Sequence, residues 1–153
     1  MKRVEVKLSL PVVAPLLDVI KSVGDSLDRQ LAAPLAMQDL ESEFRDAWTG
    51  DLLASQNEDV HTLLGLFDSE FFSGGVIGFD EDNAESIVRA CSAVRLRLRA
   101  QFLTGLTDEV LEGGEVELAK LGEEVRTAFM CYLFLATIQE LIIQHLDSSI
   151  IDS

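Results

Sequence analysis

The hydrophobic positions along the chain change their period once, close to the N-terminus. Apolar residues alternate with polar ones from Val4 to Leu10, which is the period of a half-buried strand, and Pro11 ends this pattern. From Pro15 onward, apolar residues recur at helical spacing. We therefore predict an all-α fold: one domain over residues 1–153, a helical bundle of about five helices with one short N-terminal strand near Arg3 to Leu10.

Glycines and prolines divide the helical part of the chain. The first predicted helix runs from Pro15 to Pro34, and a second apolar stripe ends at Thr49-Gly50-Asp51. A third stripe, from Leu53 to Phe71, ends at Gly74-Gly75. Because glycine and proline weaken or end helices, we expect the chain to leave the helical conformation at each of these places.

The second half of the chain carries clearer helix signals. Asp82, followed by Glu85, has the form of a capping box, so a helix is predicted to begin there. Gly105 suits its C-cap, and Thr107 can cap a short helical turn. The last helix spans roughly Val116 to Leu146 and is apolar over most of its circumference. Such a helix is typical of the centre of a bundle or of an oligomer interface.

The predicted N-terminal strand needs a pairing partner, because an isolated exposed strand is unstable. The other short β-like segment is Gly75 to Phe79, so either this segment or a second copy of the chain supplies the pairing. Together with the large apolar surface of the last helix, this favours a homodimer over a monomer.

The net charge of the chain disfavours some classes of binding partner. With 12 basic and 27 acidic residues, the formal net charge is −15. Such a field repels phosphate backbones and anionic lipids, so neither nucleic acid nor a membrane is an expected partner. The densest apolar run, Ala128 to Ile138, is too short to span a bilayer before Gln139 and Glu140. Without a signal-peptide cleavage pattern, the expected location is the cytoplasm.

Two motifs resemble metal sites but lack ligands. Glu58 and His61 have the Glu-x-x-His spacing of di-iron bundles, yet the other histidine, His145, has no glutamate three positions before it. The acidic stretch that begins at Asp80 has the outline of a calcium loop, but Glu85 stands where that loop needs glycine. We therefore expect no metal and no other cofactor.

The sequence also offers no clear nucleophile. Cys91 and Cys131 both fall within apolar helical patterns, which predicts two buried, reduced, structural cysteines. A thiol in apolar surroundings is a poor nucleophile, because burial raises its pKa. No serine stands in a nucleophile-elbow motif, so no catalytic residue is assigned.

Arginines are concentrated on the helix predicted after Asp82, which carries four of the eight: Arg89, Arg95, Arg97 and Arg99. They can form an anion site, or they can lay their stems on apolar surface and neutralise neighbouring carboxylates. The helical spacing favours the structural interpretation, with Arg95 meeting Glu140 of the last helix in an ion pair. The alternative is a polar pocket lined by Arg95, Gln139 and Glu140.

Several short motifs in the second and later predicted helices resemble those of one protein family. They are Phe44-Arg45 followed by Leu52, Val94-Arg95-Leu96, and Tyr132 with Leu135, Gln139 and Ile142. This set resembles an uncharacterised bacterial family, domain of unknown function 2017, over about residues 40 to 146. The resemblance implies a helical bacterial protein with no established activity.

The sequence leaves two functions open and identifies no protein partner. The leading hypothesis is a non-enzymatic, adaptor-like interaction protein of the cytoplasm, because recognisable catalytic chemistry is missing and apolar helix surface is plentiful. The alternative is a small-molecule-binding or enzymatic helical bundle with a polar pocket around Arg95 and Glu140. A closed ion pair at Arg95 favours the first function, whereas an unpaired Arg95 beside a cavity favours the second.

Overall fold

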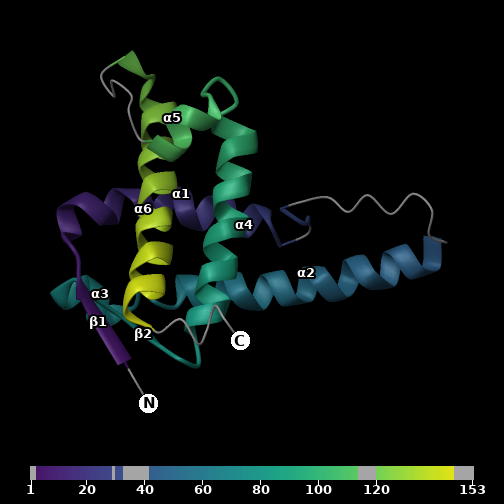
Figure 1. Ribbon diagram of the computed structural model, residues 1–153, viewed down its shortest axis with the longest axis horizontal. Helices are drawn as coiled ribbons and strands as arrows, with labels where there is room; N and C mark the ends of the chain where they lie inside the picture. Colours follow the sequence, from purple (N-terminus) through teal and green to yellow (C-terminus); the bar gives the residue numbers. More distant parts are fainter. Residues whose placement is uncertain (1–2, 29, 33–41, 114–119, 147–153) are drawn as a thin grey trace.

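The computed structural model describes residues 3–28, 30–32, 42–113 and 120–146. In chain order its elements are β1 (Arg3–Lys7), α1 (Leu10–Ser26), α2 (Ser42–Leu64), α3 (Ser69–Gly74), β2 (Val76–Asp80), α4 (Ala84–Phe102), α5 (Asp108–Gly113) and α6 (Glu123–His145). The mostly α-helical class predicted from the sequence is confirmed. α4 and α6 lie side by side, α1 crosses behind them, and α2 runs across the lower end of α4 (Figure 1).

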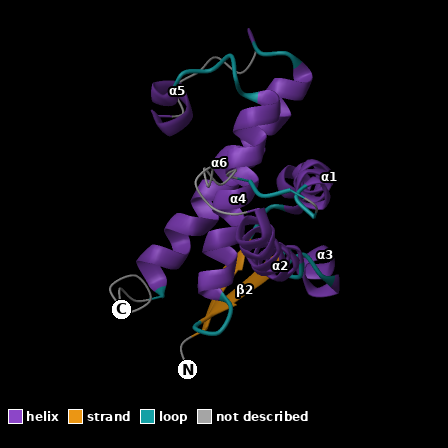
Figure 2. Cartoon of the chain, turned by 90° about the vertical axis from the view of Figure 1, so that its right-hand side faces the viewer, coloured by secondary structure: helices purple, strands orange, loops and turns teal. Residues whose placement is uncertain are grey.

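The two strands form a small antiparallel sheet at one end of the helices (Figure 2). Val4 pairs with Phe79 and Val6 with Ile77, so the β-like segment after Gly75 supplies the partner that β1 needs. Pairing within one chain thus removes the need for a second copy at this place. Leu8 continues the contact by donating its backbone N–H to the carbonyl of Gly75 at 2.7 Å.

The first helix begins five residues earlier than predicted, at Leu10 rather than Pro15. Pro11 lies in the first helical turn, where the missing N–H has no intrahelical partner and the fixed φ suits a helix. Pro15 lies inside the helix on its exposed side, where its ring removes one backbone hydrogen bond. The helix ends at Ser26 instead of continuing toward Pro34.

A side chain of α2 accounts for this early end. Gln56 donates from Nε2 to the carbonyls of Leu27 at 2.9 Å and Gln30 at 3.1 Å. Its Oε1 accepts the backbone N–H of Ala32 at 3.0 Å. Gln56 therefore satisfies backbone groups that a longer α1 would have used itself, and it fixes the segment after α1 against α2.

The predicted break at Thr49-Gly50-Asp51 is wrong, because α2 runs through it without interruption. Glycine in a helix interior costs about 1 kcal/mol relative to alanine, which weakens a helix but does not end it. The next apolar residues form the second half of α2 and then the separate α3. Asp68 caps α3 by accepting the N–H of Phe71, and Gly75 ends it in the left-handed conformation, with φ at 75°.

The capping box predicted at Asp82 and Glu85 is also wrong. The N-cap of α4 is Asn83, and neither predicted residue makes the expected bond. Instead, the carboxylate of Asp80 accepts the N–H groups of Asp82 at 2.9 Å and Asn83 at 3.0 Å. The Asn83 side-chain oxygen accepts the N–H of Asp80 at 2.9 Å. These reciprocal bonds turn the chain from β2 into α4, and α4 ends at Phe102, before Gly105.

The single hydrophobic core lies where α1, α2, α4 and α6 meet. α6 begins at Glu123, and the preceding part of the predicted last helix, residues 116–119, lies outside the described residues. By length and composition alone α6 could cross a membrane, a criterion that core helices of soluble proteins also meet. Here it packs along α4 and against α1, as expected for a central helix.

Candidate functional site

Arg95 of α4 faces α6 and is held there by two residues of that helix. Its Cζ atom lies 4.4 Å from the centroid of the Tyr132 ring, a stacking distance for a guanidinium on an aromatic face. Its Nη1 donates to Oε1 of Gln139 at 2.7 Å. The cation is thus fixed both in position and in orientation.

Gln139 is itself oriented by two other bonds. Its side chain is only 8% exposed. Both hydrogens of its amide nitrogen are used, one on the carbonyl of Val88 and one on the hydroxyl oxygen of Ser92, each at 2.8 Å. An amide group presents donors on one side and an acceptor on the other, so these bonds direct the acceptor oxygen toward Arg95.

We expected Arg95 to meet Glu140, and the structure pairs it with the neighbouring residue instead. Glu140 is exposed and accepts a hydrogen bond from Gln144 at 3.2 Å. Consecutive residues of a helix differ by about 100° in direction, so only one of the two can face α4. A neutral amide occupies that position, which avoids burying a second charge. The structure therefore brings Arg95 and Gln139 together and leaves Glu140 outside.

Arg95 consequently has no carboxylate partner in the described part of the chain, where the ion pairs are those of Arg3 and Arg89. Its Nε is buried without a hydrogen-bond partner, and Nη2 makes no hydrogen bond to a described residue. This is unusual in a chain of net charge −15, because burying a cation without a counter-charge is unfavourable. Nη2 therefore remains available for an anion, whereas the buried Nε does not.

A hollow of about 250 Å³ opens beside this guanidinium, on the α6 side of α4. Five residues line it: Ser92, Arg95, Leu96, Arg99 and Tyr132. We refer to it as the Arg95 hollow. A carboxylate can accept a charge-assisted hydrogen bond from Nη2 of such an arginine. The hollow is therefore suited to a carboxylate group.

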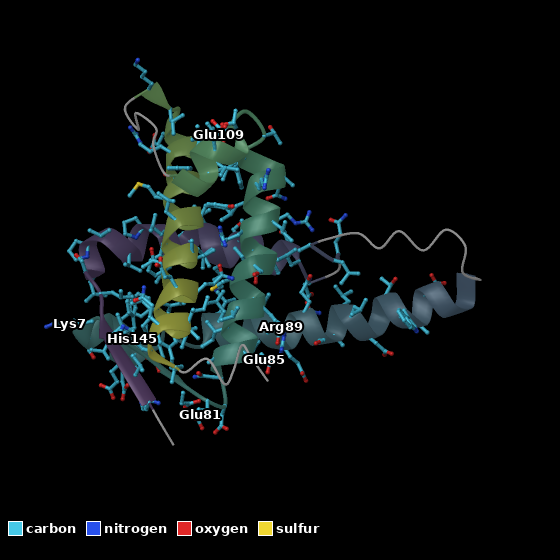
Figure 3. The ribbon with its side chains drawn as sticks, viewed as in Figure 1. Lys7, Glu81, Glu85, Arg89, Glu109 and His145 are labelled. Carbon is cyan, nitrogen blue, oxygen red and sulfur yellow. The ribbon has the colours of Figure 1, made fainter. Side chains whose placement is uncertain are left out.

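Arg89 differs from Arg95, because it is paired with carboxylates. It donates to both oxygens of Asp59 in α2, at 2.9 and 3.0 Å, and it meets Glu85 at 2.7 Å (Figure 3). The hydrogen bond to Asp59 raises the pKa of the Arg89 guanidinium above its ordinary value. Asp59 is 6% exposed, so this pair fastens α2 to α4. Arg89 thus has the carboxylate partners that the structural interpretation expects, whereas Arg95 packs on Tyr132 and bonds Gln139 without a carboxylate among the described residues.

A groove of about 350 Å³ lies on the other side of α4, toward α2. Its apolar lining includes Ala90, Ala93 and Leu96 of α4, Leu52 of α2, and the Leu31–Ala32 segment that Gln56 holds in place. We refer to it as the α2–α4 groove. Leu96 belongs to both hollows, so the exposed face of α4 is a continuous surface between α2 and α6.

A larger hollow of about 630 Å³ lies between α1, the end of α4 and the start of α6. Its charged lining residues are all acidic: Asp18, Glu123 and Glu124. A sequence pattern does not indicate this hollow, because its walls come from three segments that are far apart in the chain.

The two cysteines are free and buried, as predicted. Burial raises the pKa of both thiols to about 12. The Sγ of Cys131 donates weakly to the carbonyl of Leu16 at 3.5 Å. Neither residue therefore supplies a thiolate at neutral pH.

The two histidines are exposed and lie on different helices, His61 on α2 and His145 at the end of α6 (Figure 3). Glu58, the carboxylate of the Glu-x-x-His motif, is exposed as well. Within the described ranges, no three His, Cys, Asp or Glu side chains gather closely enough to hold a metal ion.

Comparison with protein-family models matches residues 16–146 to a domain of unknown function, DUF2017. The chain belongs to this family. The match includes Arg95, Tyr132 and Gln139, and it confirms the resemblance inferred from the short motifs around them. No curated protein and no solved structure matches this DUF2017 chain. The family description assigns no activity, so the function has to be argued from the site itself.

Proposed function

We propose that this DUF2017 protein is a non-enzymatic, adaptor-like interaction protein of the cytoplasm that uses Arg95 to hold a carboxylate of a protein partner. The observation that carries the proposal is the state of Arg95. Gln139 and Tyr132 fix its guanidinium, while the described part of the chain supplies no carboxylate for it. A binding site arranged before the partner arrives loses little entropy when the partner binds.

The surroundings of Arg95 are those of a protein-binding surface. The ring of Tyr132 forms an apolar wall beside it, and Arg99 lines the same hollow. Arginine beside apolar side chains is frequent at the centres of protein interfaces. The net charge of −15 argues against nucleic acid and anionic membranes as partners, and it makes an isolated basic site more selective.

The chemistry of the hollow supports binding more than catalysis. None of its five lining residues is a histidine, carboxylate or cysteine. The hydroxyl of Ser92 accepts a hydrogen bond from Gln139, and no histidine or carboxylate in the hollow could activate it as a nucleophile. The two thiols of the chain are buried elsewhere, with pKa values raised to about 12.

Affinity purification from the native host tests this proposal. The wild-type protein is compared with Arg95→Gln, and with Arg126→Gln as a control that removes one charge from α6 outside the hollow. We expect wild type and Arg126→Gln to retain the same partner, and Arg95→Gln to lose at least about tenfold in affinity, as for loss of a charged contact. Equal retention of that partner by all three proteins would reject Arg95 as the contact.

The same Arg95 also favours a second function, because a guanidinium without a carboxylate beside a hollow is what a small-molecule site presents. The hollow, of about 250 Å³, is nevertheless smaller than the roughly 300–1,000 Å³ of most ligand pockets, so a protein partner remains the first proposal. Such a site can bind a small carboxylic acid as a ligand or as an enzyme substrate. Its lining includes Arg95 and Tyr132, and it does not include Glu140, which the sequence predicted there. Thermal melts with millimolar acetate, succinate or citrate distinguish the two functions. A concentration-dependent rise in Tm that disappears in Arg95→Gln supports the small-molecule function.

A further inference from the structure

The N-terminal half of α2 projects away from the rest of the molecule (Figure 1). None of the residues from Asp46 to Ser55 is buried, and from Asp46 onward the first buried residue of the helix is Asp59. We refer to residues 46–55 as the α2 arm. A helical segment of this length has little stability of its own in water, and most helical stability comes from tertiary packing. The arm therefore lacks the packing that would stabilise it.

The arm presents an apolar face without a partner. Trp48 is 58% exposed and Leu52 is 41% exposed, and residues four positions apart lie on the same side of a helix. Leu52 also lines the α2–α4 groove, opposite Leu96. Exposed tryptophan and leucine next to an apolar groove are typical of a surface that is covered by another protein.

The charges of the arm and the groove complement each other. Asp51 lies beside the apolar face, about 80° from its centre at 100° per residue, and it is in no ion pair of the described structure. On α4, Arg97 also lacks a carboxylate partner: its Nη2 donates to the side chain of Gln30 at 3.0 Å, and its Nε is buried without a bond. Gln30 belongs to the segment that forms one wall of the groove. An acidic residue beside the apolar face of the arm and a basic residue beside the groove therefore both lack an ion-pair partner within the described chain.

We infer that a second copy of this chain covers the α2–α4 groove, with the arms of the two copies antiparallel about a two-fold axis. In this arrangement Trp48 of each copy enters the groove of the other beside Leu96, and the carboxylate of Asp51 approaches Arg97 of the other copy. In a two-fold dimer the same contact forms twice, because each copy presents both an exposed Trp48 and an α2–α4 groove. The inference goes beyond the proposed function, since the Arg95 hollow opens on the α6 side of α4 and this groove on the α2 side.

Trp48 is the single tryptophan of the chain, so its fluorescence reports directly on this contact. We expect light scattering to give a dimer at micromolar concentration, with blue-shifted emission that moves to the red as the protein is diluted to monomers. Leu52→Asp and Leu96→Asp should weaken the dimer at least about tenfold, the effect of a charge in an interface core, and should shift the emission to the red. Trp48→Asp should be monomeric by light scattering.

Phe72→Asp is the matched control, because Phe72 is 57% exposed on α3, away from the groove. It should leave both the mass and the emission unchanged, and unaltered circular dichroism shows that every variant is folded. Three results would overturn the inference. They are a monomer with red-shifted emission, a monomer whose emission is blue at every concentration because its own chain covers Trp48, and a dimer that survives both Trp48→Asp and Leu96→Asp. The Arg95→Gln experiment does not depend on any of them.

Discussion

Gln139 accepts the hydrogen bond of Arg95 at 2.7 Å, at a position where a glutamate would have made an ion pair. The amide can do what a carboxylate cannot, because it donates at the same time to Val88 and Ser92. One side chain therefore closes the contact between α4 and α6 and leaves the positive charge of Arg95 uncompensated. The site is therefore rigid and positively charged at the same time.

Replacing Gln139 by leucine should reduce the free energy of unfolding by about 1–3 kcal/mol, the effect of leaving buried polar groups without partners. The carbonyl of Val88 and the Nη1 of Arg95 lose their bonds in this variant. Urea unfolding followed by circular dichroism measures the change. Gln144→Leu, on the exposed side of the same helix, should stay within about 0.5 kcal/mol of wild type. An equal effect of both substitutions would contradict the assigned role of Gln139.

The pair Arg89–Asp59 should respond unequally to removal of its two partners. Asp59 is buried, whereas the Arg89 side chain is 49% exposed. Asp59→Asn leaves an arginine that water can reach, and we expect a loss of about 1 kcal/mol. Arg89→Met leaves a buried carboxylate without its counter-charge, and we expect a larger loss of about 2–3 kcal/mol. Chemical denaturation at pH 7 tests the order, and the reverse order would contradict the burial of Asp59.

The buried thiols should make the protein less stable in alkali. Burial raises the folded-state pKa of Cys91 and Cys131 to about 12, whereas a thiol of an unfolded chain has a pKa of about 8.5. Above pH 8.5 the unfolded state binds fewer protons than the folded state. Stability should therefore fall as pH rises from about 8.5 to 12, by about 1.4 kcal/mol per pH unit for each thiol. Below this window the two thiols contribute no pH dependence.

Stability curves of wild type and of the double variant Cys91→Ala, Cys131→Ala isolate this contribution from that of the other titrating groups. We expect a shallower alkaline slope in the double variant. Ellman's reagent should also react slowly with native wild-type protein and rapidly after denaturation. Rapid reaction of the native protein would show that the thiols are accessible.

Gly75 should not tolerate a side chain. Its φ is 75°, and a Cβ atom added there would lie 2.5 Å from the carbonyl oxygen of Leu8. Gly75→Ala should therefore reduce stability by about 1–3 kcal/mol through backbone strain and displacement of β1. The neighbouring Gly74 is the control, because nothing lies within 4 Å of an added Cβ. Thermal unfolding of the two variants should show a lowered Tm for Gly75→Ala alone.

Gly50→Ala should have the opposite effect and stabilise the protein. The residue lies inside α2, and an added Cβ meets nothing within 4 Å. Alanine in a helix interior is favoured over glycine by about 0.5–1 kcal/mol, so helicity by circular dichroism and Tm should both rise. Gly50→Pro should lower both, because proline interrupts the backbone bonds of the helix. A chain that left the helical conformation at Gly50 would show neither effect.

The helical class, the central position of the last helix and the burial of both cysteines could be predicted, because each follows from periodicity that no distant contact overrides. The predicted boundaries of helices and strands are less accurate where a single glycine or proline is the evidence for them. Gly50 weakens a helix without ending it, and Pro11 suits a first turn as well as it suits the end of a strand. The end of α1 depends on Gln56, whose role is set by tertiary contact and has no local signature.

The candidate site shows the same limit. Helical spacing places Arg95 and Gln139 on neighbouring helices. It also favours Glu140 as the partner of Arg95, because a half-buried arginine is expected to pair with a carboxylate. A difference of one residue is about 100° around a helix, finer than a hydrophobic pattern can resolve. The contribution of Ser92, which orients Gln139, could have been found only by following hydrogen bonds from residue to residue.

The strand pair has a consequence for how the chain folds. Arg3 pairs with Asp80, so α1, α2 and α3 of the described chain lie between the two strands in the sequence. The entropy lost on closing a loop grows with its length, and contacts between distant parts of a chain form late and slowly. β1 should therefore dock after α1 and α2 have packed together. Its backbone amides should be the last in the N-terminal half of the chain to become protected from hydrogen exchange during folding. A nascent chain that has not yet reached β2 must leave the ribosome with this strand uncovered, a period in which it is exposed to chaperones and proteases.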